Sequence, residues 1–259
     1  VANPVPVDAD TLFQIGSITK TFLGTLVMRL VEEGKLDLDV PVRRWVPELR
    51  LRDEDAAARA TLRHLLTHYA GWFGDHFVDL GENDDALARY VASMADLEQQ
   101  VPLGSEWAYN NAAFGLAGRV VELVTDLPIE TAMREQLLEP LGLARTFFFA
   151  REVITHRVAA GHNAFDGTPQ VVRPWALPRA SNCVGGIVST VPELLRYARF
   201  HMGDGTTADG VRYLSAEALE HMRSPLARGP LGQQRGIGWA VQDVKGVRMG
   251  SHFDAWNKT

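Results

Sequence analysis

The sequence contains a single cysteine, Cys183, among 259 residues. One cysteine cannot form a disulfide within the chain, so packing must stabilise the fold, and cysteine usage leaves the cellular compartment undecided. The flanking residues 181–186 hold no histidine that could act as a thiolate partner. We therefore expect Cys183 to be a buried structural residue and not a nucleophile.

Long apolar runs and an excess of basic residues are also missing. No stretch approaches the roughly 20 apolar residues of a membrane-spanning helix, and the N-terminus lacks the basic-then-apolar order of a signal peptide. The net charge is -6, whereas nucleic-acid-binding proteins usually carry a clustered basic surface. The composition predicts a soluble protein without a membrane span or a nucleic-acid partner, either cytoplasmic or exported with its signal removed.

What is present is enough apolar sequence for a large core, because 46% of the residues are hydrophobic. Apolar residues recur at helical spacing from Ser17 to Glu33, where Gly34 gives a stop, and again in the middle of the chain. Thr190 and Glu193 form a predicted capping box for a later helix. The other predicted helices span residues 62–67, 84–94, 112–124, 128–138, 190–202 and a segment after 215.

Short strands are predicted at both ends of the chain. They span residues 185–189, 236–241 and 247–249, and a turn joins the last two. Residues 11–16 are predicted to be extended or loop-like, and residues 35–39 to form a short strand or turn. Residues 146–170 are predicted to be irregular. This order predicts an α+β fold in which helices flank an antiparallel sheet beside a large all-α subdomain. We expect one catalytic unit over residues 1–259. Its α/β part would comprise about residues 1–15 and 180–259, and its mainly helical part about residues 16–179.

Ser17 and Lys20 form a Ser-x-x-Lys motif where the first predicted helix begins. A serine hydroxyl is a weak nucleophile near neutral pH, and a lysine whose surroundings lower its pKa can serve as its base. Three residues on a helix bring both side chains to one face, and the first helical turn directs unpaired N–H groups toward developing negative charge. The motif predicts the nucleophile and general base of a serine acyl hydrolase. The alternative is a helix cap at Ser17 and a solvated Lys20.

A second candidate is the segment Tyr109-Asn110-Asn111 before a predicted helix. Tyr109 could act as a base toward Ser17 and later protonate the leaving group, with a nearby ammonium group stabilising its phenolate. Asn111 could hold a substrate carbonyl or Lys20 by hydrogen bonds. The alternative is a helix cap by Asn110 or Asn111 and an aromatic plug by Tyr109.

His64 and His68 lie four residues apart, with Asp75 and His76 further along, and such residues can bind zinc. The glutamate of a His-Glu-x-x-His motif is missing, however. We expect these histidines to be hydrogen-bonded structural residues beneath the loop at residues 72–73. We predict no metal and no other cofactor.

Together the motifs resemble those of the serine β-lactamase and penicillin-binding protein superfamily, specifically its class C β-lactamase-related branch. The ordered matches are Phe13-Gln14-Ile15-Gly16-Ser17-Ile18-Thr19-Lys20, His64-Leu65-Leu66-Thr67-His68-x-x-Gly71, Tyr109-x-Asn111-x-x-Phe114-x-Leu116-x-Gly118, Gly185-Gly186-Ile187-x-Ser189-Thr190 and Gly236-x-Gly238-Trp239. The resemblance covers about Thr11 to Met249. It implies a β-lactamase/transpeptidase-like fold.

The resemblance also implies an acyl-serine mechanism. Ser17 attacks a carbonyl carbon, a covalent acyl-enzyme forms, and water releases the acid. Lys20 and Tyr109 share the proton transfers, and the backbone N–H of Ser17 is one donor of the oxyanion hole. The implied substrate is a small molecule or short peptide with an acyl group, which is an ester, an amide such as a D-amino-acid peptide, or a β-lactam.

The third motif of the family, Lys-Thr-Gly or His-x-Gly on an edge strand, is altered here. His252-Phe253-Asp254 lies closest to the expected position, but Asp254 replaces the glycine. A carboxylate there would project where the substrate backbone approaches and would disfavour an anionic substrate. With His252 as the equivalent, the family arrangement suggests a second oxyanion N–H from about Ala255. The alternative equivalent is Lys258-Thr259.

Both ends of the chain are short relative to the family, so we expect an incomplete sheet and a fragment, a processed chain or an engineered product. Two functions stay open. The sequence favours a serine hydrolase. The alternative is a catalytically impaired binding protein of the same fold that captures an acyl or peptide ligand without turnover. The sequence predicts no oligomeric state.

Overall fold

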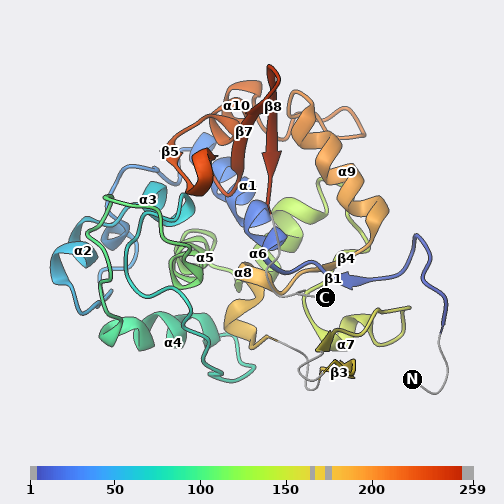
Figure 1. Cartoon of the computed structure of the whole chain (residues 1–259), viewed down its shortest axis with the longest axis horizontal. Coiled ribbons are helices and arrows are strands. Elements are labelled where there is room, and N and C mark those ends of the chain that lie inside the picture. The colour runs from blue at the N-terminus through green and yellow to red at the C-terminus, as the bar shows by residue number, and fades with distance from the viewer. Residues whose placement is uncertain (1–4, 164–166, 173–176, 253–259) are drawn as a thin grey trace.

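The computed structural model describes residues 5–163, 167–172 and 177–252. The helix α1 (Thr19–Glu32), drawn in blue in Figure 1, occupies the centre and packs against α5 (Asn111–Thr125), α8 (Asn182–Gly185) and α10 (Ala216–Arg223). Helices combined with antiparallel strands confirm the predicted α+β class. The boundaries between an α/β part and a helical part stay a prediction.

In the described ranges, the strands form three separate antiparallel sheets. One pairs β1 with β4, another pairs β2 with β3, and the third has four strands in the order β5-β6-β7-β8. The strands are β1 (Phe13–Gln14), β2 (His162–Asn163), β3 (Gln170–Val171), β4 (Val188–Ser189), β5 (Ala227–Arg228), β6 (Gln234–Arg235), β7 (Ala240–Val244) and β8 (Val247–Ser251). The remaining helices are α2 (Glu54–Arg59), α3 (Leu62–Leu66), α4 (Ala86–Ala92), α6 (Ile129–Met133), α7 (Ala150–Val153) and α9 (Val191–Met202).

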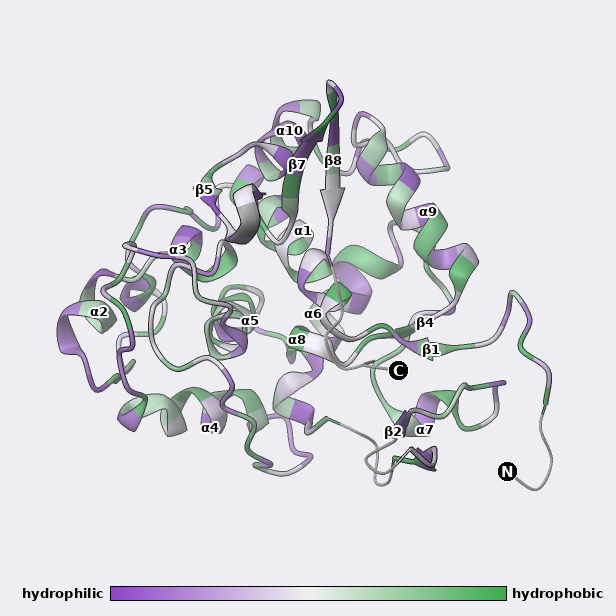
Figure 2. Ribbon diagram, viewed as in Figure 1, coloured by the Kyte–Doolittle hydropathy of each residue, from purple (hydrophilic) through white to green (hydrophobic). Residues whose placement is uncertain are grey.

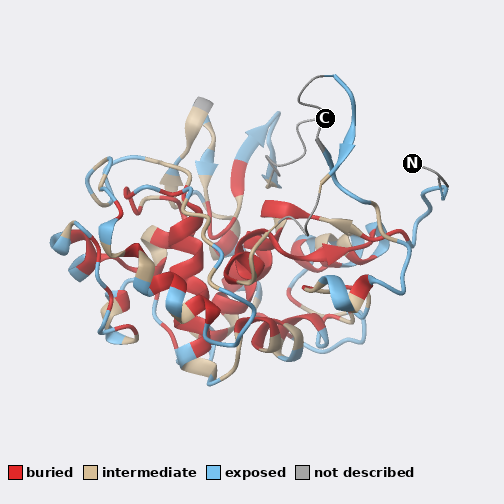
Figure 3. Ribbon diagram, turned by 90° about the horizontal axis from the view of Figure 1, so that it is seen from below, coloured by how far each residue is buried: buried red, intermediate tan, exposed pale blue. Residues whose placement is uncertain are grey.

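The central helix α1 is buried on nearly all sides. Eleven of its 14 residues are buried, whereas a helix on the surface of a protein buries only one stripe. Figure 3 shows this concentration of buried residues in the middle of the molecule, while the far ends of β7 and β8 are exposed. The start of α1 is therefore enclosed by packing, and it is there that the Ser-x-x-Lys motif lies.

The glycine-rich segments depart from the sequence prediction. Residues 182–185 form α8, and the strand β7 begins only at residue 240. A Cβ on Gly186 would lie 2.6 Å from the Cα of Asn182, and one on Gly236 would lie 1.9 Å from the carbonyl oxygen of Met222. Gly186 permits the tight turn that ends α8, and Gly236 permits close contact with the backbone of α10. Neither continues a strand, so the prediction that they are strand residues was wrong.

Three other local predictions were tested by the structure. The turn between β7 and β8 is confirmed, since Lys245 and Gly246 both have positive φ, as a two-residue hairpin turn requires. Residues 35–39 form turns and bends and no strand, whereas residues 146–170, predicted to be irregular, include α7 and β2.

The predicted capping box at α9 is only half formed. The hydroxyl of Thr190 accepts from the backbone N–H of Glu193. The Glu193 carboxylate instead accepts from the Arg145 backbone N–H at 3.2 Å and from the Thr146 hydroxyl at 3.3 Å. Glu193 thus joins α9 to the preceding segment, an interaction that needs tertiary structure and has no local sequence signal.

Helix α9 is amphipathic, with hydrophilic and hydrophobic segments alternating along it in Figure 2. Its inner face carries Tyr197 and His201, which both contact the Thr25 hydroxyl of α1, at 2.8 Å and 3.0 Å. Thr25 donates its own proton to the Thr21 carbonyl oxygen, so it accepts from both partners. Within the described residues, none of the helices is long and apolar enough to cross a membrane.

The buried His201 predicts a loss of stability in acid. Burial lowers the pKa of His201 to about 3, whereas an unfolded chain protonates a histidine below about pH 6.5. Between these two values the unfolded state binds the extra proton, so the free energy of unfolding should fall by up to about 1.4 kcal/mol per pH unit as the pH drops. In His201→Gln, the free energy of unfolding measured with urea should fall less steeply with decreasing pH than in the wild type. The difference should be seen between about pH 6.5 and 5, where carboxylates remain ionised. The exposed His156→Gln is the control, and an unchanged slope in His201→Gln would contradict this assignment.

Cys183 is buried, as predicted, and burial raises the pKa of its thiol, which disfavours a nucleophilic role. It packs closely on Gly118 of α5, where an added Cβ would lie 2.6 Å from the Cys183 sulfur. Gly118→Ala should therefore lower the free energy of unfolding by about 1–3 kcal/mol. Adding Cys183→Ala should recover part of that loss because it removes the overlapping sulfur. Urea denaturation of both single variants and the double variant measures this coupling, and strictly additive losses would refute it.

Candidate active site

Three side chains that the sequence singled out meet at the start of α1. Lys20 Nζ donates to Ser17 Oγ at 3.0 Å, and the Tyr109 hydroxyl donates to the same oxygen at 2.7 Å. Ser17 is 4% exposed and Lys20 is 0% exposed. A solvated Lys20, one of the alternatives, is therefore wrong. Tyr109 comes from a segment 92 residues away along the chain and completes the cluster.

Local backbone geometry presents Ser17 at a sharp turn. Gly16 has φ 48, and Gly16–Ile18 form a single turn of 3-10 helix before α1. The N-cap of α1 is Ile18, without a side-chain hydrogen bond, so Ser17 does not cap the helix. The pairing of β1 with β4 holds the preceding strand in place. The Ser17 hydroxyl is therefore held toward Lys20 and Tyr109.

Lys20 is fixed by more than its sequence neighbour. Its Nζ also donates to the Val184 carbonyl oxygen of α8 at 2.9 Å, and it lies 5.0 Å from the centre of the Tyr109 ring and 5.7 Å from that of Phe114. The Gly185-Gly186 motif thus belongs to the same site, because the turn that it allows places Val184 against the lysine. A backbone carbonyl has no signature in the sequence, so this contact was not predicted.

His68 packs against the ring of Tyr109. The two rings stack with their centres 4.4 Å apart and an angle of 30° between their planes. His68 Nδ1 accepts from the Asn110 backbone N–H at 3.0 Å, and burial, followed by the positive charge of Lys20, holds the pKa of His68 well below its usual range. The imidazole is therefore neutral, with its proton on Nε2. The prediction that His68 is a hydrogen-bonded structural residue is confirmed, and its partners are the Asn110 backbone and the Tyr109 ring.

The other histidine of this motif is also hydrogen-bonded. His64 Nδ1 contacts the Thr61 hydroxyl at 2.9 Å. His76 Nε2 contacts the Ser93 hydroxyl at 2.8 Å. In the ranges that the structure describes, no three histidine, cysteine, aspartate or glutamate side chains converge in a way that could hold a metal ion.

The two asparagines after Tyr109 have different partners. Asn110 caps α5, since its side chain accepts from the Ala113 backbone N–H at 2.8 Å, which confirms the capping alternative for this residue. Asn111 is the first residue of α5, and its Nδ2 donates to the Asp75 carboxylate at 2.8 Å. The contact with Asp75 was not predicted. The substrate-binding role of Asn111 stays a prediction.

His252 lies close to the cluster of Ser17, Lys20 and Tyr109, at the end of the described chain. Its Nδ1 donates to the Gly238 carbonyl oxygen at 2.8 Å. Burial, followed by the positive charge of Lys20, lowers the pKa of His252 to about 3, so the ring is neutral. Gly238, in the segment between β6 and β7, has φ +73°, and a Cβ there would lie 3.0 Å from the Lys20 carbonyl oxygen, so glycine is favoured where this segment passes α1.

The remaining third-motif predictions lie outside the described residues. They concern Asp254, the oxyanion donor Ala255 and the alternative Lys258. The choice between His252 and Lys258 therefore stays open, and so does the position of the second oxyanion donor.

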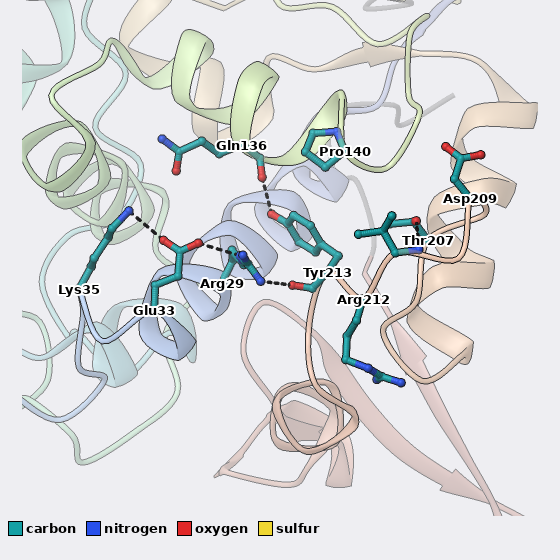
Figure 4. A pocket seen from close by; sticks show the side chains of 10 residues that line it. Arg29, Glu33, Lys35, Gln136, Pro140, Thr207, Asp209, Arg212 and Tyr213 are labelled. Atoms are coloured by element: carbon teal, nitrogen blue, oxygen red, sulfur yellow. Dashed lines mark hydrogen bonds and ion pairs between the residues drawn. The ribbon is translucent and has the colours of Figure 1, made fainter.

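A cavity of about 440 Å³ elsewhere in the molecule is not part of this cluster (Figure 4). Three of its charged groups are paired with one another, because Glu33 accepts from Arg29 and Lys35, and a fourth, Arg212, pairs with Asp204. The Tyr213 hydroxyl, in turn, donates to the Gln136 carbonyl oxygen. We assign no chemistry to this cavity.

Known proteins place this arrangement in context. Penicillin-binding protein 4 of Amycolatopsis lactamdurans is 36% identical over 258 residues, covering 97% of this chain and 68% of that protein. Esterase EstB of Burkholderia gladioli is 35% identical over 182 residues, covering 65% of this chain and 45% of that protein. An octameric penicillin-binding protein homologue from Pyrococcus abyssi superposes with a TM-score of 0.79 at 28% identity, covering 96% of this chain and 57% of that one. The chain thus spans between about half and two thirds of the length of these relatives.

The family model described as "Beta-lactamase" matches residues 1–257. The resemblance drawn from the motifs and the expected β-lactamase/transpeptidase-like fold are both confirmed by this match and by the structural likeness. The chain belongs to the beta-lactamase family of serine hydrolases.

Proposed function

We propose that this chain is a serine acyl hydrolase that acts through an acyl-Ser17 intermediate on an ester, amide or β-lactam carbonyl. The observation that carries the proposal is the placement of Ser17 Oγ between Lys20 Nζ and the Tyr109 hydroxyl, at 3.0 Å and 2.7 Å. A hydroxyl in contact with two groups that can exchange protons meets the requirement for an activated nucleophile. The relatives, which include an esterase and penicillin-binding proteins, support this choice of substrates.

In the proposed reaction the Ser17 oxygen bonds to the carbonyl carbon while its proton passes to the Lys20–Tyr109 pair. The pair then protonates the leaving group as the bond from carbon to that group breaks. Water next attacks the acyl group, one water proton passes to the pair, and Ser17 regains a proton as the acid departs. Both partners contact one oxygen, so we treat them as a single titrating unit and do not assign a sole base.

Burst kinetics with p-nitrophenyl acetate test the proposal. An acyl-enzyme mechanism in which deacylation is slow should release about one equivalent of p-nitrophenolate per protein before the steady state. Binding of the ester without any p-nitrophenolate release above the spontaneous rate would favour the alternative, a binding protein that keeps the fold without turnover.

A further inference from the structure

Arg235 of β6 lies at the edge of the catalytic cluster. Its guanidinium is 4.8 Å from the centre of the Trp107 ring, and the Trp107 ring is 6.3 Å from that of Tyr109. The chain of contacts therefore runs from Ser17 through Tyr109 and Trp107 to a positive charge. A guanidinium over an aromatic ring can still donate from its outer N–H groups to an anion.

The guanidinium is half-buried, and it has no carboxylate partner within the described part of the chain. Its Nε is buried without a hydrogen-bond acceptor there, and its contact with the Gln233 side chain is long, at 3.5 Å. Arg179, by comparison, is also partly buried but is paired with Glu130 and Asp84. Glu106, next to Trp107 in sequence, is exposed and is not paired with Arg235.

The charge of Arg235 also acts on the catalytic cluster itself. It contributes to the low pKa of His68 and of His252, although burial is the largest cause in both. Burial likewise lowers the pKa of Arg235. A partly desolvated cation beside a reactive centre, with no compensating anion among the residues that the structure describes, is suited to an anionic ligand, and arginine binds carboxylates through two parallel hydrogen bonds.

We propose that Arg235, whose guanidinium lies over the Trp107 ring, is a specificity-determining residue that binds a carboxylate on the leaving group of the substrate. We place the carboxylate on the leaving group and not on the acyl group because of the position of Tyr109. Tyr109 lies between Ser17 and Trp107 and belongs to the pair that protonates the leaving group. The inference rests on the proposed acyl-Ser17 function. It opposes the expectation from Asp254, which predicts that an anionic substrate is disfavoured.

Two phenyl esters with the same acyl group test this assignment. One carries a meta-carboxylate on its phenol and the other does not. Both give the same acyl-enzyme, so their rates can differ only in binding and acylation, the steps that determine kcat/KM. The wild-type protein should prefer the anionic ester by about tenfold or more at low salt, as expected for a charge-assisted hydrogen bond. Raising the salt concentration to about 0.5 M should weaken this preference in the unmodified protein.

The variant Arg235→Gln should abolish the preference while changing kcat/KM for the neutral ester by less than about threefold. Arg228→Gln removes an equal charge from the paired strand β5 and should leave the preference intact, because Arg228 pairs with Gln234 and its side chain leaves the sheet on the face opposite to that of Arg235. An equal loss of kcat/KM for both esters in Arg235→Gln would mean a structural role. A wild-type protein that prefers the neutral ester would support the expectation that Asp254 disfavours an anionic substrate. Either result overturns the assignment. Ser17-dependent turnover of the neutral ester without charge discrimination refutes this inference alone, whereas no turnover of either ester refutes the proposed function as well.

Discussion

Replacing Ser17 with alanine should reduce turnover of p-nitrophenyl acetate by about 10⁴-fold or more, because the oxygen that forms the acyl bond is removed. The burst of p-nitrophenolate should disappear completely. The variant should remain folded, since the change deletes one oxygen atom from a residue that does not cap α1. Steady-state and stopped-flow assays measure both effects.

The matched control is Ser105→Ala, which removes an exposed hydroxyl that contacts only the nearby Pro102 carbonyl oxygen. It should leave both the burst and the steady-state rate unchanged. Turnover in Ser17→Ala within tenfold of the wild type would show that another residue carries the acyl group, and it would remove the basis of the proposed mechanism.

Lys20→Met should lower kcat/KM for the same ester by about 10³-fold, within the range of 10²–10⁴ that general acid–base catalysis usually contributes. Methionine resembles lysine in length and leaves no charge in a site that is 0% exposed, so the core around α1 should tolerate it. The Ser17 hydroxyl remains in this variant. Slow acylation of Ser17 is therefore expected, and complete loss is not.

The control for this prediction is Lys35→Met. Lys35 is half-exposed and paired with Glu33 on the surface, so its replacement should leave kcat/KM unchanged. A Lys20→Met protein that keeps its activity within tenfold of the wild type would exclude Lys20 from proton transfer and would leave Tyr109 as the base.

The sequence predicted the Ser17–Lys20 pair because three residues on a helix fix the geometry locally. The approach of Tyr109 could not follow from spacing, since 92 residues separate it from Ser17. The sequence offered a Tyr109 base as one of two alternatives, and the resemblance to a known family favoured it. The contacts of Val184 and Arg235 were not predicted at all. A backbone carbonyl carries no residue signature, and the position of Arg235 over the Trp107 ring depends on the tertiary fold.

The strands were predicted less well than the helices for a related reason. Helix α5 was predicted at residues 112–124 and is found at Asn111–Thr125, because its apolar periodicity and its cap are local. The segments around Gly186 and Gly236 have glycine for close contact with other elements, which a single sequence cannot distinguish from a short strand.

Peptide mapping by mass spectrometry tests the central claim most directly. The protein is incubated with a penicillin, a fluorophosphonate or a short-chain ester, digested, and searched for the acyl or phosphonyl adduct. The account predicts a single adduct on the peptide that contains Ser17, formed by at least one of these reagents and missing in Ser17→Ala. An adduct on any other residue, or none on the folded wild-type protein, would contradict it.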